Sequence, residues 1–321
     1  MRKLMILVLL LTLCAVAALG EEEPRYHALA LTAFHLRREP ADDAYRIVQV
    51  PERAGVRVLE WGEEWCRVTY QAQMGYARTR WLYCFRSLDP MRYPLPEMPW
   101  RVTGYVVFRR VTVILAPDFE GTAARPGQIA CADLFTNPGD CVLPVWRGSR
   151  TLAEGEGEIR PFVPWADAEP GDIIGGYTTW YGEHQGGRKA ANRQHNIALG
   201  CTRIDGTVLD PGGSFSFNRA CGPYLKSNGY RIAPNVSRSQ EGYGGGICQV
   251  STTLYNAVLT LPLRVDEWSV HRVRGVAYAP QYFDAAVGTH SDFVFVNTLP
   301  YPIRITADPQ DGVLTVLIYR N

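Results

Sequence analysis

One cysteine in this chain stands in a setting suited to chemistry. Residues 242–259 read GYGGGICQVSTTLYNAVL, so three glycines directly precede Cys248. From Ile247 onward, apolar residues recur at helical spacing, which predicts a helix with one buried stripe. Cys248 would lie in the first turn, where unpaired N–H groups and the helix dipole favour an anion such as a thiolate. The pattern predicts a nucleophilic cysteine. The alternatives are an inert buried thiol and a half-cystine that bridges two chains.

The residues around this cysteine suggest what the nucleophile would attack. Gly244, Gly245 and Gly246 can adopt positive φ angles, let a substrate backbone approach closely and offer N–H groups to an oxyanion. Gln249 and Ser251 are further candidates for contact with the substrate or the oxyanion. Together these residues predict a thiol enzyme that carries out acyl transfer.

The N-terminus predicts export. Arg2 and Lys3 precede an apolar run over residues 4–19, which ends in small residues and is followed by three glutamates. This order is typical of a secretory signal peptide, here residues 1–20, removed near Gly20. An uncleaved membrane anchor is the alternative, because the apolar run approaches spanning length.

Export changes the interpretation of the cysteines. The chain has 8 cysteines, and seven remain once Cys14 is removed with the signal. Thiols outside the cytosol tend to form disulfides, and an odd number leaves one over. Neighbours along the chain suggest the pairs Cys66–Cys84, Cys131–Cys141 and Cys201–Cys221, with Cys248 left free. Other connectivities remain open.

Composition excludes several classes of function. The 321 residues suffice for two domains, and 46% hydrophobic with 20% charged residues is ordinary for globular chains. A net charge of +1 gives no electrostatic reason to expect nucleic acid as a partner. The Cys and His spacings match no zinc site, so we expect neither a metal nor a cofactor.

The N-terminal part reads as a small all-β domain. Over residues 26–88, short segments alternate apolar and polar positions between turns. The segments GVRVLEWGEEW, WCRV and GYARTRWLY resemble a bacterial SH3-like domain, a resemblance that implies a small barrel binding cell-wall peptide or glycan; a spacer without a ligand is the alternative. Residues 89–101 are Pro-rich and read as a linker. Residues 102–171 mix strand-like and loop-like segments, and we expect them to pack on the following domain without an assigned function.

The last 150 residues, 172–321, carry a second and more specific resemblance. Their motifs are similar to those of the VanW domain family, first known from vancomycin-resistance clusters. The matching segments are Asn192-Arg193, Asn196-Ile197, Pro211-Gly212, Phe215 to Asn218, Gly244 to Ala257, His271 and Asp284 to Val287. The resemblance marks Asn192, Arg193, Asn196 and Asn218 as supporting residues of the site. The segment around His271 reads VHR where the family usually has His-Ser.

The resemblance also suggests how the thiol is activated. His271 stands where the family has its histidine and is the favoured general base, and Asp284 is the favoured residue to orient it, with Asp292 next. A structural histidine in a loop is the alternative for His271. Some VanW-domain proteins are understood to be L,D-transpeptidases, which implies 3–3 cross-linking of peptidoglycan through Cys248. The alternatives are a cysteine peptidase or amidase of the wall, and a non-catalytic wall-binding or glycopeptide-response protein.

These observations define the expected architecture and partners. We expect an α+β protein in which a small SH3-like barrel precedes a mixed α+β domain. A long helix beginning near Ile247 would pack on strands formed by residues 292–308 and 312–320, which read as a C-terminal antiparallel hairpin. The expected partners are peptidoglycan stem peptides, the expected location is the cell wall, and no stable protein partner is implied.

Overall fold

The computed structural model describes most of the chain. It covers residues 24–52, 54–94, 102–116, 119–134, 139–145, 148–181, 187–235, 241–271, 276, 278–279, 283–310 and 312–321. The predicted signal peptide, residues 1–20, and the end of the predicted linker, residues 95–101, lie outside this part. In the part described, no helix is both long and apolar enough to cross a membrane.

The chain divides into two compact units, with the boundary between Leu88 and Asp89. In its described residues, the first unit has seven antiparallel strands and one short 3₁₀ helix, η1 (Thr79–Trp81). The strands pair in the order β3-β2-β6-β5-β4-β1-β7. The strands are β1 (Tyr26–Ala30), β2 (Phe34–Arg37), β3 (Arg46–Val50), β4 (Gly55–Glu60), β5 (Trp65–Tyr70), β6 (Gln73–Arg78) and β7 (Leu82–Ser87). Because this order ends at β3 and β7 without a pairing between them, no closed barrel is shown, and the SH3-like assignment stays a prediction.

The second unit begins with β strands that form their own sheet. Five strands pair in the order β13-β12-β11-β8-β14, and β9 pairs with β10 in a separate hairpin. The strands are β8 (Val102–Phe108), β9 (Thr112–Ala116), β10 (Phe119–Ala124), β11 (Ile129–Asp133), β12 (Val142–Val145), β13 (Gly148–Thr151) and β14 (Gly157–Pro161). Val102 and Cys131 share a hydrophobic core with the helices and strands that follow, so this region packs on the rest of the unit.

The remaining strands of the second unit form three sheets. The largest has the order β15-β23-β22-β16, and β22 and β23 form a long antiparallel hairpin at the end of the chain. The other two sheets have the orders β17-β21-β20 and β18-β19. The strands are β15 (Ile173–Trp180), β16 (Val208–Leu209), β17 (Ser214–Ser216), β18 (Ile232–Pro234), β19 (Glu241–Tyr243), β20 (Arg264–Glu267), β21 (Val294–Val296), β22 (Ile303–Gln310) and β23 (Val313–Arg320).

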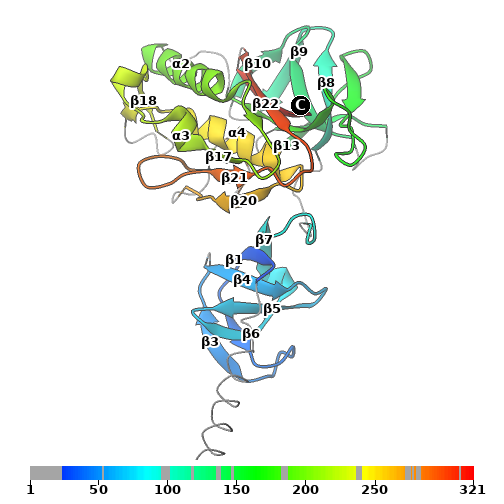
Figure 1. Cartoon of the computed structure of the whole chain (residues 1–321), viewed down its shortest axis with the longest axis vertical. Helices are drawn as coiled ribbons and strands as arrows, with labels where there is room; N and C mark the ends of the chain where they lie inside the picture. Colours follow the sequence, from blue (N-terminus) through cyan, green and yellow to red (C-terminus); the bar gives the residue numbers. More distant parts are fainter. Residues whose placement is uncertain are drawn as a thin grey trace, which may run out of the picture. The chain divides into compact units, whose positions relative to one another are not determined.

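Three α-helices complete the described part of this unit. They are α2 (Gly187–Ile204), α3 (Phe217–Cys221) and α4 (Ile247–Leu259), and a 3₁₀ helix, η2 (Lys226–Asn228), lies between α3 and β18. Helix α4, yellow in Figure 1, packs against β15 and β23 and against α2. Every residue of α4 except Cys248 and Leu259 is buried. The helix is therefore enclosed on nearly all sides and is not a surface helix with a single apolar stripe.

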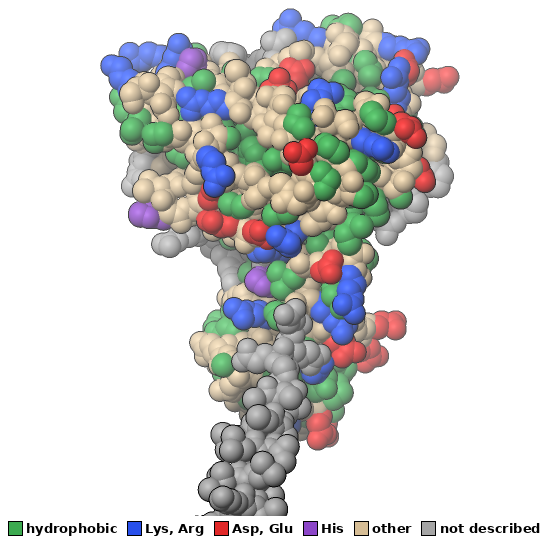
Figure 2. All heavy atoms as spheres, viewed as in Figure 1, with side chains coloured by type: hydrophobic (Ala, Val, Ile, Leu, Met, Phe, Trp, Pro, Cys, Tyr) green, Lys and Arg blue, Asp and Glu red, His purple; other side chains and the backbone are tan. Residues whose placement is uncertain are grey.

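In the part of the chain that the structure describes, strands far outnumber helices, which agrees with the expected α+β class. Side chains of both charge signs are present on the described surface (Figure 2). Figure 2 shows Lys and Arg side chains interspersed with Asp and Glu side chains on the face in view.

The predicted disulfides are absent from the structure. Every cysteine in the described part is a free thiol: Cys66, Cys84, Cys131, Cys141, Cys201, Cys221 and Cys248. The first six are buried and pack as small apolar side chains. Cys131 and Cys141 belong to different hydrophobic clusters, whereas Cys201 and Cys221 share one. Burial raises the pKa of the Cys131 thiol to about 12 and that of Cys141 to about 11.

Candidate active site

Cys248 lies at the start of α4, as the spacing predicted. The helix begins at Ile247, and Gly246 before it has a φ angle of 104°, in the left-handed region that glycine tolerates. Gly244 also has a positive φ of 84°. The two glycines turn the chain sharply from β19 into the helix. The turn places Cys248 in the first helical turn, where the helix dipole favours negative charge. It is the one cysteine of the described part that is not fully buried.

The three glycines are also needed for close packing within the protein. A Cβ atom on Gly245 would lie 2.5 Å from the carbonyl oxygen of Ala233 in β18. On Gly246 it would lie 2.9 Å from Cγ of Arg193, and on Gly244 it would lie 3.1 Å from Cβ of Tyr224. The space beside each glycine is therefore occupied by the protein's own atoms. The prediction that they hold a substrate or an oxyanion stays untested, and packing is sufficient to explain why glycine stands there.

The supporting residues of α2 hold this turn in place. Asn196 is fully buried, and its side-chain amide donates to the carbonyl oxygens of Arg231 (2.9 Å) and Gly245 (3.0 Å) and accepts from the Arg231 N–H (2.8 Å). Asn192 donates to the Ile232 carbonyl oxygen at 2.8 Å. These bonds join α2 to β18 and to the glycine turn. The two asparagines thereby position the nucleophile without contacting it.

Gln249 and Ser251, predicted to contact the substrate or the oxyanion, lie in the interior instead. Gln249 accepts a hydrogen bond from Arg193 at 2.6 Å and donates to Thr179 at 3.0 Å. Ser251 donates to the carbonyl oxygen of Ala285 at 2.7 Å. Both side chains are fully buried. They fix α4 to its neighbours because a buried polar group must find a partner within the fold.

His271 and Asp284 are brought together as predicted. Nδ1 of the His271 ring lies 2.6 Å from Oδ2 of Asp284, and the same oxygen accepts the His271 backbone N–H at 2.7 Å. The Asp284 side chain is only 2% exposed and that of His271 is 13% exposed. A carboxylate this buried needs a charged or hydrogen-bonded partner, and His271 provides it.

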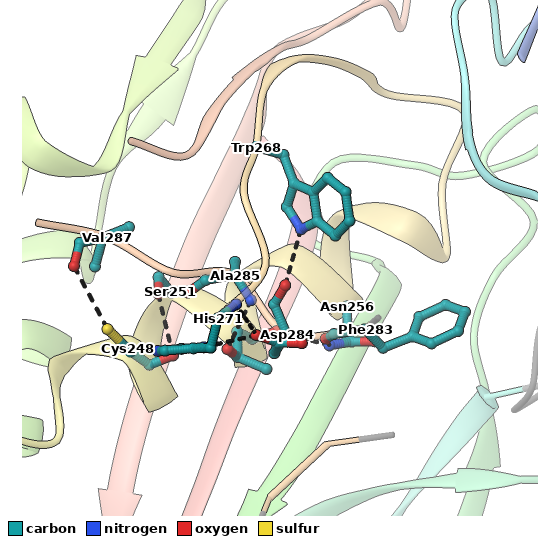
Figure 3. Close-up of polar contacts among 10 residues, drawn as sticks. Cys248, Ser251, Asn256, Trp268, His271, Phe283, Asp284, Ala285 and Val287 are labelled. Carbon is teal, nitrogen blue, oxygen red and sulfur yellow. Dashed lines mark hydrogen bonds and ion pairs between the residues drawn. The ribbon is translucent and has the colours of Figure 1, made fainter. Parts of the chain in front are cut away.

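The pKa of His271 connects it to the cysteine. Burial alone would lower that pKa, but hydrogen bonds to Asp284 and to Cys248, together with the Coulomb attraction of both groups, raise it to about 9. Because Nδ1 faces Asp284, Nε2 is the ring nitrogen left for the sulfur. Figure 3 shows the imidazole between the side chains of Cys248 and Asp284. A thiol, an imidazole and a carboxylate thus stand in sequence, the arrangement that activates a nucleophilic cysteine.

A set of hydrogen bonds, drawn in Figure 3, docks the segment that carries Asp284 onto α4. Asn256 donates to the carbonyl oxygen of Phe283 at 2.7 Å, and Thr252 accepts the N–H of Ala285 at 3.0 Å. The indole N–H of Trp268 donates to the carbonyl oxygen of Asp284 at 3.0 Å. The helix that bears the nucleophile therefore also holds the carboxylate in register with it.

Sequence reasoning missed several residues near the thiol. Trp268, Thr252 and Asn256 were not singled out, although all three lie within the motifs that drew attention to the site. Tyr224 and Tyr278 lie near Cys248, and burial followed by neighbouring charges raises the pKa of both phenols well above its ordinary value. No local signal marks either tyrosine, because their relation to the site depends on how distant segments fold together.

Asp292, the second choice as the orienting carboxylate, has a different task. Its carboxylate accepts hydrogen bonds from the Ser216 hydroxyl at 2.6 Å and from the backbone N–H of Asn218 at 2.8 Å. Asp292 therefore anchors the start of α3. In the part of the chain that the structure describes, no group of three His, Cys, Asp or Glu side chains could hold a metal ion.

Comparison with known proteins agrees with the motifs. A family model described as "VanW like protein" matches residues 192–319, which include Cys248, His271 and Asp284. This part of the chain is a VanW-like domain. Over 151 residues the chain is 37% identical to the uncharacterized protein YoaR of Bacillus subtilis (strain 168), a match that covers 46% of this chain and 48% of that protein. The matched region thus spans about half the length of this relative. The family resemblance seen in the sequence is confirmed.

Two solved structures show faint similarity to the chain. NlpC2 from Trichomonas vaginalis aligns with a TM-score of 0.18 and 9% identity over 58% of each chain. NlpC1 from the same organism aligns with a TM-score of 0.19 and 10% identity over 95% of each chain. Similarity at this level supports no conclusion about the fold or the activity of the VanW-like domain.

Proposed function

We propose that the VanW-like domain is a cysteine acyltransferase of the cell wall, an L,D-transpeptidase that forms 3–3 cross-links in peptidoglycan. The observation that carries the proposal is the arrangement of Cys248, His271 and Asp284, in which one imidazole contacts both the thiol and a buried carboxylate. The family resemblance supports the choice of substrate, and the N-terminal signal pattern supports export to the wall.

The first half of the reaction forms a thioester. The thiol proton of Cys248 passes to His271, and the thiolate attacks the carbonyl carbon of the third residue of a donor stem peptide. The bond from that carbon to the nitrogen of the terminal D-alanine breaks, and His271 gives its proton to the leaving amine. Asp284 stabilises the imidazolium that exists between these two proton transfers.

The second half transfers the acyl group. The side-chain amine of an acceptor stem attacks the thioester carbon, the carbon–sulfur bond breaks, and the proton lost by the amine returns to the sulfur through His271. Attack by water in place of the amine would make the same residues a peptidase or amidase. Exclusion of water from the thioester would favour transfer.

Muropeptide analysis tests this function. Purified protein and its Cys248→Ala variant are incubated with peptidoglycan, and the products are separated and identified by mass spectrometry. New 3–3 cross-linked dimers are expected only with the unaltered protein. Cys84→Ala, which alters a buried thiol of the N-terminal unit, should leave them unchanged. Shortened, uncross-linked stems would indicate hydrolysis, and identical profiles for the protein and Cys248→Ala would exclude an enzymatic function.

A non-catalytic wall-binding role predicts different behaviour of the thiol. In that case Cys248 would be merely packed and would react slowly with iodoacetamide at neutral pH. Its contact with His271 predicts fast alkylation, because the imidazole can take up the thiol proton as the sulfur reacts. Peptide mapping of the alkylated protein would show whether Cys248 is the labelled residue.

A further inference from the structure

The backbone carbonyl of Val287 lies directly beside the nucleophile. The Cys248 thiol donates to its oxygen, with Sγ 3.5 Å from O. Figure 3 shows this carbonyl and the sulfur facing each other, next to the His271 ring. A carbonyl oxygen has two lone pairs, so the weak S–H donor leaves capacity for a stronger N–H donor. The activation by His271 and Asp284 makes no use of this group.

The direction of this carbonyl is fixed from both sides. The N–H of Gly288 donates to the Ser291 carbonyl oxygen at 2.9 Å, and the N–H of Ala286 donates to the Ser269 carbonyl oxygen at 2.7 Å. In a planar trans peptide the C=O and the following N–H point in opposite directions. Holding the Gly288 N–H therefore also holds the Val287 carbonyl in its orientation toward the sulfur.

Asn218 and Tyr224 support the same loop. The side-chain amide of Asn218 donates to the carbonyl oxygens of Gly288 and Ser291, each at 2.9 Å. The Tyr224 hydroxyl donates to Oδ1 of Asn218 at 2.6 Å, which orients the amide. The Tyr224 side chain also packs beside Gly244, in the turn that leads to Cys248. Tyr224 thus links the loop that contains Val287 to the glycine turn that precedes Cys248.

We propose that the Val287 carbonyl is a substrate-binding group that accepts the N–H of the residue whose carbonyl Cys248 attacks, and that Asn218 and Tyr224 are positioning residues for it. The proposal rests on the proposed function and identifies how that site recognises its donor peptide. In an acyl donor, this N–H is attached to the Cα atom next to the attacked carbon. When sulfur approaches that carbon, the N–H comes within reach of an acceptor beside the sulfur. The favoured ligand is a peptide whose attacked residue has a free amide N–H.

Binding of a substrate N–H to the Val287 oxygen would also affect the proton of the Cys248 thiol. In the free protein the S–H donates to the Val287 oxygen. A substrate N–H that takes over this oxygen removes one acceptor of the thiol proton and leaves His271 as the other. Substrate binding and formation of the nucleophile are then coupled through a single backbone group.

Two small nitriles test the proposal without requiring turnover. The nitrile of N-acetyl-L-alanine places an electrophilic carbon where the attacked carbonyl would be and keeps the N–H. Its ester analogue, O-acetyl-L-lactonitrile, replaces that N–H with oxygen. The Cys248 thiolate adds to the nitrile carbon and a proton from His271 goes to the nitrogen, which gives a neutral thioimidate. Affinity is measured as protection of Cys248 from iodoacetamide.

The amide nitrile is expected to bind about tenfold more tightly than the ester nitrile, as one hydrogen bond to a fixed acceptor predicts. In Tyr224→Phe this preference should fall to about threefold, with protection in each protein measured against its own rate of alkylation by iodoacetamide alone. Tyr301→Phe is the matched control, because it removes a similar hydroxyl bond, to the Trp165 carbonyl oxygen at 2.6 Å, and should keep the tenfold preference.

Equal protection by the two nitriles, or protection by neither, would overturn the inference. Its failure is distinguishable from failure of the proposed function. A preference for the amide nitrile without new cross-links in peptidoglycan would contradict transpeptidation alone. New cross-links without the preference would contradict the role of Val287 alone.

Discussion

Two partly buried histidines, one in each unit, have pKa values that are shifted in opposite directions. His27 in β1 is opposite Arg57 of β4 on one side and opposite Arg86 of β7 on the other. Burial and then the positive charges of Arg86 and Arg57 lower its pKa to about 4. Burial also acts to lower the pKa of His271, but its hydrogen bonds to Asp284 and Cys248 raise it to about 9.

The difference shows that the charges and hydrogen-bond partners around a histidine, more than its burial, determine its pKa and its ability to transfer protons. His27 stays neutral over the physiological range and lies between cations, so it is a structural residue of a sheet. His271 is held between an acceptor and a thiol, so it can take up a proton and return it. The sheet places His27 beside the cationic side chains of Arg57 and Arg86. Helix α4 and the segment docked on it place His271 beside Asp284 and Cys248, which favour its protonated form.

The largest expected effect is on activity. His271→Gln should lower kcat/KM for acyl transfer about 10²–10⁴-fold, the usual contribution of a general acid–base group. His27→Gln should change kcat/KM by less than about twofold. Rates of cross-link formation by the full chain check both values. A comparable loss in the two variants would show that the histidines do not differ in function.

The next effect is a displaced pH profile. Asp284→Asn keeps the shape of the side chain but removes the charge that helps raise the pKa of His271. The unaltered protein should lose activity as the pH rises through about 9, where the imidazolium gives up its proton. In the variant this alkaline limb should move to lower pH, and kcat/KM should fall by about 10²-fold. An alkaline limb that does not move would contradict the role of Asp284.

A smaller effect concerns stability, and its sign differs between the two histidines. The folded pKa of His27 is lowered, so its contribution to stability is present above about pH 6.5 and is lost as the pH falls through about 4. The folded pKa of His271 is raised, so its contribution is complete below about pH 6.5 and is lost as the pH rises through about 9.

Thermal unfolding across this pH range measures the contrast. Relative to the unaltered protein, His27→Gln should lessen the fall in Tm on acidification, and His271→Gln should lessen the fall on alkalinisation. Each change should amount to about 2–4 °C. If both substitutions change the Tm only at acidic pH, or both only at alkaline pH, the two pKa values are not shifted in opposite directions.

The smallest effect compares two hydroxyl groups. Ser251 in α4 and Thr79 in the N-terminal unit each donate to a carbonyl oxygen at 2.7 Å, that of Ala285 and that of Gly62 respectively. Ser251→Ala and Thr79→Ala should each lower the free energy of unfolding by about 1 kcal/mol. Only Ser251→Ala should also lower kcat/KM, by about threefold. The Ser251 hydroxyl holds the carbonyl of Ala285, the residue next to Asp284, so its loss should loosen the position of that carboxylate. Denaturant titration and cross-linking rates on the same samples test this.

The local features of the protein were accessible from the sequence. Alternation of apolar and polar residues predicted the strands around residues 55–60 and 65–70, and they are present as β4 and β5. The glycines followed by a helical spacing predicted a helix beginning near Ile247, which is where α4 begins. These signals are short-range, because each depends on residues only a few positions apart.

Features that depend on distant segments were not accessible in the same way. The polar side of α4 is buried because Thr252 and Asn256 find partners in residues 283–285, a pairing that no spacing within the helix indicates. The surroundings of Gly245 and Gly246 come from β18 and α2. Sequence proximity failed for Cys131 and Cys141, which lie in separate cores. The pairing of His271 with Asp284 came from family resemblance, not from geometry.

The double contact of His271 with one carboxylate oxygen restricts how the ring can move. Its backbone N–H and its Nδ1 both engage Oδ2 of Asp284, so a half-turn of the ring would break the side-chain contact while the main chain stayed anchored. The two ring nitrogens therefore cannot exchange places during a catalytic cycle. A proton that binds at Nε2 has to leave from the same atom. The imidazole therefore uses Nε2 alone to exchange protons with the sulfur of Cys248 and with the amine of the substrate.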